Sequence, residues 1–170
     1  MFLIVGPSGS GKDTLIAAAR ERLGPAYVFP RRVITRPANA GAEDHIAASA
    51  SAFEARERAG DFALTWRAHD LAYGIPASIE ADLAGGNHVV INVSRTVVPE
   101  ARKRFAPTCV VLVTAPPETL RARLVARGRE KADAVAERLD RAPPVDADAI
   151  IVNDGQLQTA VDAFIAALKG

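Results

Sequence analysis

A glycine-rich segment at residues 6–14, Gly-Pro-Ser-Gly-Ser-Gly-Lys-Asp-Thr, constrains the fold of this chain more than any other feature. It follows the apolar run Phe2–Val5 and precedes Leu15–Ala19, which is typical of the start of a helix. Glycines let consecutive backbone N–H groups curve around a phosphate group, and a helix N-terminus adds a positive dipole. We therefore predict a phosphate-binding loop (P-loop) between a strand and a helix.

The segment matches the pattern G-x-x-x-x-G-K-[ST] except at its last position, where Asp13 replaces the hydroxyl residue. Lys12 would place a cation on the outer phosphates of ATP. Asp13 or Thr14 would contact Mg²⁺. Alternatively, Asp13 only stabilises the helix N-terminus through its negative charge. A glycine-rich hairpin with a solvated lysine explains the strand–loop–helix context less well. The candidate ATP-binding residues of the loop are Gly6, Pro7, Ser8, Gly9, Ser10, Gly11, Lys12, Asp13 and Thr14.

Apolar runs alternate with helix-forming segments along the rest of the chain. This alternation predicts an α/β P-loop NTPase fold, a parallel sheet flanked by helices with right-handed crossovers. With 170 residues, of which 49% are hydrophobic, the chain suits a single domain with a sizeable core. The predicted strands after the P-loop are 27–29, 89–93, 109–114 and 149–152, and the predicted helices are 13–23, 77–84, 98–105, 118–126, 132–141 and 157–168.

Two segments interrupt the alternation. Residues 31–74 form a partly β insertion, with a helix predicted at 51–59, a strand at 62–66 and a turn at Tyr73-Gly74. Residues 121–141 are rich in arginine around Gly128. In a P-loop enzyme these are the natural places for an acceptor-binding region and a closing lid. The core would then comprise residues of about 1–30, 75–120 and 142–170.

Three arginines of the second segment are candidate catalytic residues together with Lys12. Arg123 and Arg127 are four positions apart, so both lie on one helix face, and Arg138 follows. Transfer of a phosphoryl group needs positive charges that converge on the γ-phosphoryl. The alternative is a solvated basic face paired with glutamates.

Several motifs occur in the order seen in guanylate kinases, and the chain resembles this family over nearly its whole length. The resemblance implies that Arg36 and Tyr73 bind the acceptor phosphate, and that Asn153 and Asp154 lie near the adenine. It also implies that the three arginines belong to the lid. The motifs are the P-loop, Thr35-Arg36-Pro37 with Gly41 and Glu43, Tyr73-Gly74, Arg123-Leu124-x-x-Arg127-Gly128, Glu137-Arg138-Leu139 and Asn153-Asp154.

The chain departs from guanylate kinases where they contact guanine. The glutamate that binds the guanine edge aligns with Leu64, and the Thr-Ser after their Tyr-Gly aligns with Ile75-Pro76. A second phosphate-binding arginine aligns with Asn39. An apolar residue would leave guanine donors without partners, which lowers specificity by orders of magnitude. GMP is therefore not the expected acceptor.

The chain is similar instead to the ribose 1,5-bisphosphate phosphokinases, relatives of guanylate kinases that act in phosphonate degradation. The resemblance implies ATP-dependent phosphorylation of the 1-phosphate of ribose 1,5-bisphosphate, giving 5-phosphoribosyl 1-diphosphate, with Mg²⁺ as cofactor. The motifs that carry it are Gly11-Lys12-Asp13, Ile34-Thr35-Arg36, Glu43-Asp44-His45-Ile46, Thr65-Trp66, Asn92-x-Ser94-Arg95 and Asn153-Asp154-Gly155.

A sugar with two phosphates needs two cationic groups to hold it. Arg36 would bind one phosphate, and Arg32 and Arg95 are candidates for the other. Each of these two has an alternative, Arg32 as a surface strand residue and Arg95 as an ion-pair partner at a helix start. Glu43 and His45 are candidates for hydrogen bonds to ribose hydroxyls. Because an acceptor phosphate is already a nucleophile at neutral pH, no general base is needed.

Together with the resemblance, the net charge and the hydropathy of the chain leave ATP and a small phosphorylated sugar as the expected partners. A net charge of +1 gives no overall field that favours nucleic acid or an anionic membrane. No apolar stretch approaches the roughly 20 residues that span a bilayer, and Met1 leads directly into the first predicted strand, so we expect a cytoplasmic protein. Two other functions stay open: a nucleoside-monophosphate kinase, guanylate kinase first, and an inactive guanylate-kinase-like interaction module. The oligomeric state stays open as well.

Overall fold

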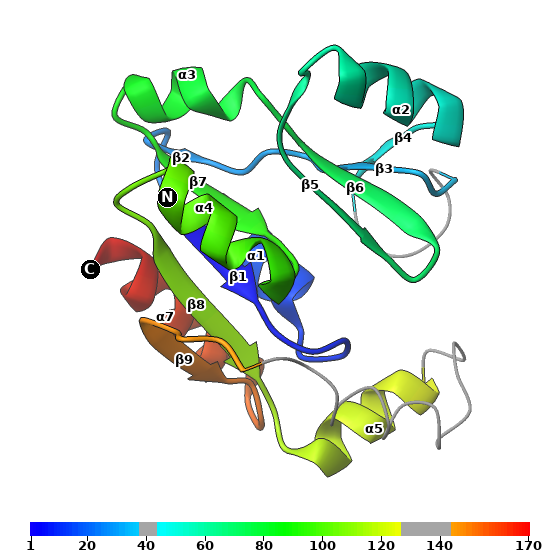
Figure 1. Ribbon diagram of the computed structural model, residues 1–170. Coiled ribbons are helices and arrows are strands. Elements are labelled where there is room, and N and C mark those ends of the chain that lie inside the picture. Colours follow the sequence, from blue (N-terminus) through cyan, green and yellow to red (C-terminus); the bar gives the residue numbers. More distant parts are fainter. Residues whose placement is uncertain (38–43, 127–143) are drawn as a thin grey trace.

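A parallel sheet forms the centre of the chain in the computed structural model, which describes residues 1–37, 44–126 and 144–170 (Figure 1). Its strand order is β2-β7-β1-β8-β9, and every neighbouring pair runs parallel. This arrangement confirms the predicted α/β fold. The strands are β1 (Phe2–Val5), β2 (Tyr27–Val28), β7 (His88–Asn92), β8 (Cys109–Thr114) and β9 (Ala149–Val152).

Helices cover both faces of this sheet, which is why its strands are nearly continuous apolar runs. On one face, Leu15 and Phe164 from two helices pack with Ile4 and Val111 of the sheet. On the other face, Val98 packs with sheet residues and with a second sheet. The helices are α1 (Lys12–Arg22), α3 (Ile79–Ala84), the 3₁₀ turn η1 (Arg95–Val97), α4 (Val98–Arg104), α5 (Pro117–Ala126) and α7 (Leu157–Lys169).

The helix predicted at 132–141 lies outside the described residues. Among the residues that the structure describes, none of the helices combines the length and the apolar character that a bilayer crossing requires.

The second sheet comes from the segment between α1 and α3. Its order is β4-β3-β6-β5, and the long β5–β6 hairpin carries most of it (Figure 1). Helix α2 packs on this sheet through Phe53, whose ring stacks on Phe62 at a centroid distance of 4.7 Å. The elements are β3 (Val33–Ile34), β4 (Ile46–Ala47), α2 (Ala50–Arg58), β5 (Phe62–Ala68) and β6 (Leu71–Pro76).

The turn predicted at Tyr73-Gly74 is wrong, because both residues lie inside β6. The hairpin turns instead at His69 and Asp70, which have φ angles of 53° and 58°. Gly74 is required for packing: a Cβ there would lie 2.7 Å from the ring of Phe62. This glycine therefore marks the close approach of a neighbouring side chain within a strand.

One apolar cluster joins the two sheets. It contains Leu3 and Val5 of β1 together with Leu64, Trp66 and Ile75 of the hairpin, and Leu64 is only 1% exposed. The hairpin thus shares a core with the P-loop strand. This shared core fixes the position of the second sheet beside the carboxyl end of β1, where the P-loop begins.

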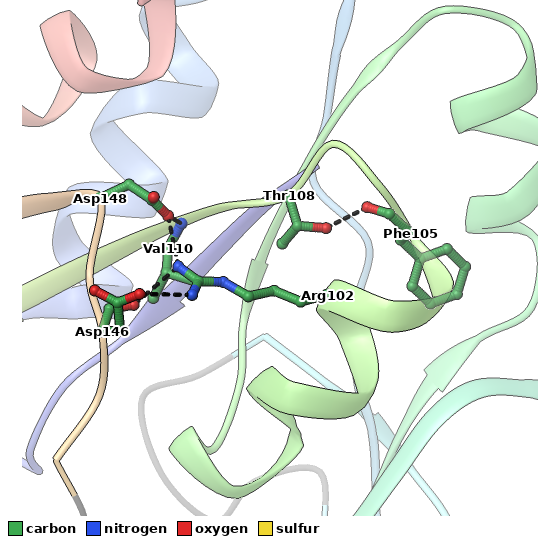
Figure 2. Close-up of polar contacts among 6 residues, drawn as sticks. All are labelled: Arg102, Phe105, Thr108, Val110, Asp146 and Asp148. Carbon is green, nitrogen blue, oxygen red and sulfur yellow. Dashed lines mark hydrogen bonds and ion pairs between the residues drawn. The ribbon is translucent and has the colours of Figure 1, made fainter.

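A polar network ties α4 to the chain that enters β9 (Figure 2). The Arg102 guanidinium donates to the side chains of Asp146 and Asp148, at 3.0 and 2.9 Å. Asp148 also accepts the backbone N–H of Val110 at 2.7 Å. In the same view, the Thr108 hydroxyl donates to the carbonyl oxygen of Phe105. The network anchors the residues just before β9 to α4 and β8. It thereby helps to position β9 and the segment that follows it.

Candidate active site

The P-loop occupies the carboxyl end of β1 and closes on the first turn of α1 (Figure 1). Gly11 is the N-cap of α1, with a φ of 89° that favours glycine. A Cβ on Gly11 would collide with the side-chain amide of Asn153, and one on Gly6 would collide with the carbonyl oxygen of Val113. Both glycines are therefore required by close contacts as well as by backbone conformation.

Asn153 lies directly behind this loop. Its Nδ2 donates a hydrogen bond to the carbonyl oxygen of Ser10 at 2.8 Å, and its side chain is buried. The neighbouring Asp154 accepts a hydrogen bond from the hydroxyl of Thr119 at 2.9 Å. The two residues expected near the adenine thus connect the end of β9 to the P-loop and to the start of α5.

Lys12 spans the mouth of the loop. Its Nζ donates to the carbonyl oxygens of Gly6 and Pro7, at 2.8 and 2.9 Å. These contacts fold the lysine side chain back onto its own loop. Arg123, on α5, approaches the other side of the loop, and its guanidinium lies 3.4 Å from the carbonyl oxygen of Gly9. The structure therefore brings together two of the predicted catalytic cations.

Asp13 and Thr14 are exposed in the first turn of α1. Asp13 accepts a hydrogen bond from Nδ2 of Asn92, at 2.8 Å. Asn92 belongs to the motif Asn92-x-Ser94-Arg95 but was not among the predicted site residues. Its place at the end of an apolar strand was a further signal, because side chains at the carboxyl ends of parallel strands border ligand sites.

Arg36 follows β3 and is held in place by His45. Nδ1 of His45 lies 3.3 Å from a guanidinium nitrogen of Arg36, and Nε2 lies 3.2 Å from the backbone carbonyl oxygen of Arg36. His45 is 4% exposed, so the imidazole is a buried support of the arginine. Arg31 fastens the same stretch through the His45 carbonyl oxygen at 2.9 Å and Asp44 at 3.0 Å.

Arg32 rests on an aromatic pair. The rings of Trp66 and Tyr73 stack at 5.1 Å with an interplanar angle of 2°. The Arg32 guanidinium lies 5.8 and 5.4 Å from their centroids, within the range of cation–π attraction. It also donates to the carbonyl oxygen of Asn92 at 3.2 Å. Tyr73, predicted to contact the acceptor, is thus part of the platform that holds Arg32.

Arg95 begins η1, directly after the N-cap Ser94. Partial burial lowers the pKa of its guanidinium from the ordinary value. Of the other predicted site residues, Glu43, Arg127 and Arg138 lie outside the described residues.

A cleft lies between α1 and the segment that connects β2 to β3, which carries Arg32. Its walls include Asp13, Arg32, Asp44, Asn92 and, on the apolar side, Phe29. The cleft places Arg32, the residue before β3, across from Asp13 in the first turn of α1.

The fold and this site define the class: a P-loop kinase with a guanylate-kinase-like architecture. Residues 3–142 match the family model described as AAA domain. A solved guanylate kinase from Anaplasma phagocytophilum superposes with a TM-score of 0.76 over 99% of this chain and 84% of that chain, at 19% sequence identity. At that identity the likeness supports the fold alone.

Comparison with curated sequences narrows the class. The chain is 53% identical, over 99% of its length and 91% of the relative, to the ribose 1,5-bisphosphate phosphokinase PhnN of Acidiphilium cryptum. It is 45% identical to the bifunctional ribose 1,5-bisphosphokinase-thymidine phosphorylase of Cupriavidus necator, of which it spans 29%. The chain belongs to the ribose 1,5-bisphosphate phosphokinase family.

Proposed function

We propose that this protein transfers the γ-phosphoryl group of ATP to the 1-phosphate of ribose 1,5-bisphosphate, giving ADP and 5-phosphoribosyl 1-diphosphate. A 1-phosphate oxygen forms the new bond to the γ-phosphorus as the bond to the β–γ bridging oxygen breaks. The acceptor phosphate is anionic and nucleophilic, so the protein supplies position and positive charge. The reaction would serve phosphonate degradation, and its use of ATP favours a cytoplasmic location.

The observation that carries this proposal is the cleft that places Arg32 opposite Asp13. It offers an acceptor a guanidinium with a fixed orientation, since Arg32 is held by two rings and by the Asn92 carbonyl oxygen. Leu64, which aligns with the guanine-binding glutamate, is turned into the shared core. The name of the A. cryptum relative supports the same acceptor.

We assign the charges by position. Lys12 in the P-loop and Arg123 beside it would act on the γ-phosphoryl group. Arg36, supported by His45, would bind one acceptor phosphate and Arg32 the other. The proposal keeps Arg95 as a further candidate for the acceptor, and it keeps Glu43, Arg127 and Arg138 in the roles that the family resemblance implies.

The P-loop also has the oxygen donors that Mg²⁺ prefers. Asp13 and Thr14 supply a carboxylate and a hydroxyl within the first turn of α1. Magnesium bound to ATP is usually held by only one or two protein oxygens together with phosphates and waters. The residues present therefore fit the ion. When bound, it neutralises charge on the β- and γ-phosphates.

Phosphorus NMR tests the proposal directly. Purified protein is incubated with Mg-ATP and either ribose 1,5-bisphosphate or GMP. We expect a new diphosphate ester with the ribose compound only. Conversion of GMP alone would establish a guanylate kinase instead. Absence of turnover, without any stabilisation by Mg-ATP, would favour an interaction module, because a ligand at a hundred times its Kd stabilises a protein by about 2.7 kcal/mol.

A pair of arginine variants tests the acceptor site. Arg32→Met should raise KM for ribose 1,5-bisphosphate by at least about tenfold, because a charge-assisted contact to phosphate is lost. KM for ATP should change little. Arg22→Met is the matched control, since Arg22 pairs with Asp162 on an exposed surface. Equal KM values for the acceptor in both variants would remove Arg32 from the site.

A further inference from the structure

Two positions of this P-loop differ together from the usual arrangement. P-loop NTPases hold Mg²⁺ with a hydroxyl from the loop and a carboxylate from a second strand. Here the loop position carries the carboxylate of Asp13. One of the two strands that flank β1 is β7, and its last residue is the amide Asn92, in register with Ile4. The negative charge lies on the loop instead of on the strand.

The two side chains are in direct contact. Nδ2 of Asn92 donates to Oδ1 of Asp13 at 2.8 Å. The backbone of Asn92 is fixed in turn, because its carbonyl oxygen accepts from Arg32 at 3.2 Å. An amide that donates to one carboxylate oxygen sets the direction of the other oxygen of that carboxylate.

We propose that Asp13 is the carboxylate that acts on the nucleotide-bound Mg²⁺ of this protein, and that Asn92 is its positioning residue. This inference rests on the proposed function only in requiring a Mg-nucleotide at the P-loop. It assigns Asn92 a role in the site. It also excludes a role of Asp13 limited to stabilising the N-terminus of α1.

The location of the charge has a consequence for the acceptor. Asp13 and Asn92 both line the cleft that contains Arg32. Because Asp13 lies on the P-loop, its carboxylate is on the wall of this cleft. The end of β7, whose backbone Arg32 contacts, carries an uncharged amide. An anionic acceptor thus meets an amide at the end of β7, where the usual arrangement would place a carboxylate.

The test uses variants that change only charge. Asp13→Asn, Asn92→Asp and the double variant Asp13→Asn/Asn92→Asp have side chains of nearly equal size, and the double variant keeps one carboxylate and one amide. The control is Asp44→Asn, which removes a carboxylate from the same cleft where it pairs with Arg31. Calorimetry measures ADP binding with Mg²⁺ and with EDTA. The readout is the Kd in EDTA divided by the Kd with Mg²⁺, which gives the gain in affinity that the metal provides. Thermal melting checks that each variant is folded.

We expect Asp13→Asn to lower this ratio by about tenfold or more, with little change in the Kd measured in EDTA. The double variant should recover most of the loss, because the carboxylate returns to the pair from the strand side. Asp44→Asn should keep the ratio of the original protein. Asn92→Asp alone should lower the melting temperature in EDTA, since it sets two carboxylates against each other, and Mg²⁺ should restore it.

Two results would overturn the inference. An unchanged ratio in Asp13→Asn would show that Asp13 does not act on the metal. A lowered ratio that the double variant fails to recover would remove Asn92 from the site. Neither measurement includes an acceptor, so the two proposals fail separately. A protein that shows the expected ratios without turnover of ribose 1,5-bisphosphate would retain this inference and lose the proposed function.

Discussion

Asn153 and Ser10 are 143 residues apart in sequence, and the amide of the first donates to the backbone carbonyl oxygen of the second at 2.8 Å. Both side chains are buried, and the contact joins the residue that follows β9 to the P-loop. The C-terminal part of the chain therefore supports the conformation of a loop formed by its N-terminal part. We therefore expect nucleotide binding to depend on this support.

Asn153→Ala should lower both stability and nucleotide affinity. It leaves a buried carbonyl oxygen without its partner, which costs about 1–3 kcal/mol. Urea denaturation measures the free energy of unfolding, and calorimetry measures the Kd for ADP. Thr119→Val is the control, because it removes the neighbouring exposed hydrogen bond to Asp154. A Kd for ADP that is the same in both variants would contradict the supporting role of Asn153.

Lys12→Ala should lower kcat by roughly 10²–10³ fold, since a cation directed at the transferred phosphoryl group is lost. Folding should be nearly unaffected, because the ammonium group donates to the carbonyl oxygens of Gly6 and Pro7 within its own loop. A coupled ADP-release assay gives kcat, and thermal melting gives the stability. Normal turnover in this variant would refute the assignment of the P-loop.

Leu64→Glu should not create a guanylate kinase. Ile75 and Pro76 still lack hydroxyls for guanine, and the structure adds a second reason: the new carboxyl would lie in the core that the two sheets share. Burial of such a group without partners costs at least about 2 kcal/mol. Thermal melting and a GMP-dependent ADP-release assay measure the two effects, with Leu64→Met as the control. A stable variant that phosphorylates GMP would show that the position faces the acceptor.

The two aspartates of Figure 2 should differ in importance. Asp148→Ala leaves the backbone N–H of buried Val110 without its acceptor, which costs about 1–3 kcal/mol. Asp146 has a side chain that is 91% exposed, so Asp146→Ala should cost less than about 1 kcal/mol. Urea denaturation of the two variants gives the comparison. Equal losses would mean that Arg102, which both aspartates share, carries the effect.

His45→Ala should weaken acceptor binding through Arg36. The imidazole contacts the guanidinium and the carbonyl oxygen of Arg36, so its loss frees an arginine proposed to bind phosphate. We expect KM for ribose 1,5-bisphosphate to rise by about tenfold and KM for ATP to stay constant. The control is His69→Asn in the exposed hairpin turn, where asparagine tolerates the positive φ. Unchanged kinetics in His45→Ala would limit His45 to a packing role.

Sequence reasoning succeeded where local pattern decides the structure. The bounds of β8 and β9 agree with the predicted strands, because both strands are continuous apolar runs with clear ends. The P-loop was equally clear, since its glycines serve local backbone geometry. The turn at His69 and Asp70 was missed, because His and Asp adopt a positive φ only occasionally, whereas Gly adopts it routinely.

The supporting contacts of the site were beyond sequence reasoning. Asn92 approaches Asp13, and His45 approaches Arg36, only because two sheets and a helix bring them together. Pattern and charge named Arg32 as a candidate without revealing that Trp66 and Tyr73 hold it. Such contacts arise from tertiary packing, which local periodicity does not encode.

The apolar cluster shared by the two sheets limits how this protein can be engineered. Leu64 and Ile75 of the hairpin complete the same cluster as Leu3 and Val97. A hairpin grafted onto another kinase without β1 and η1 would present an apolar patch to water, and the recipient would lack the surface that covers it. Exchange of acceptor specificity between such enzymes therefore requires transplantation of the hairpin together with the core residues beneath it, as one cooperative unit.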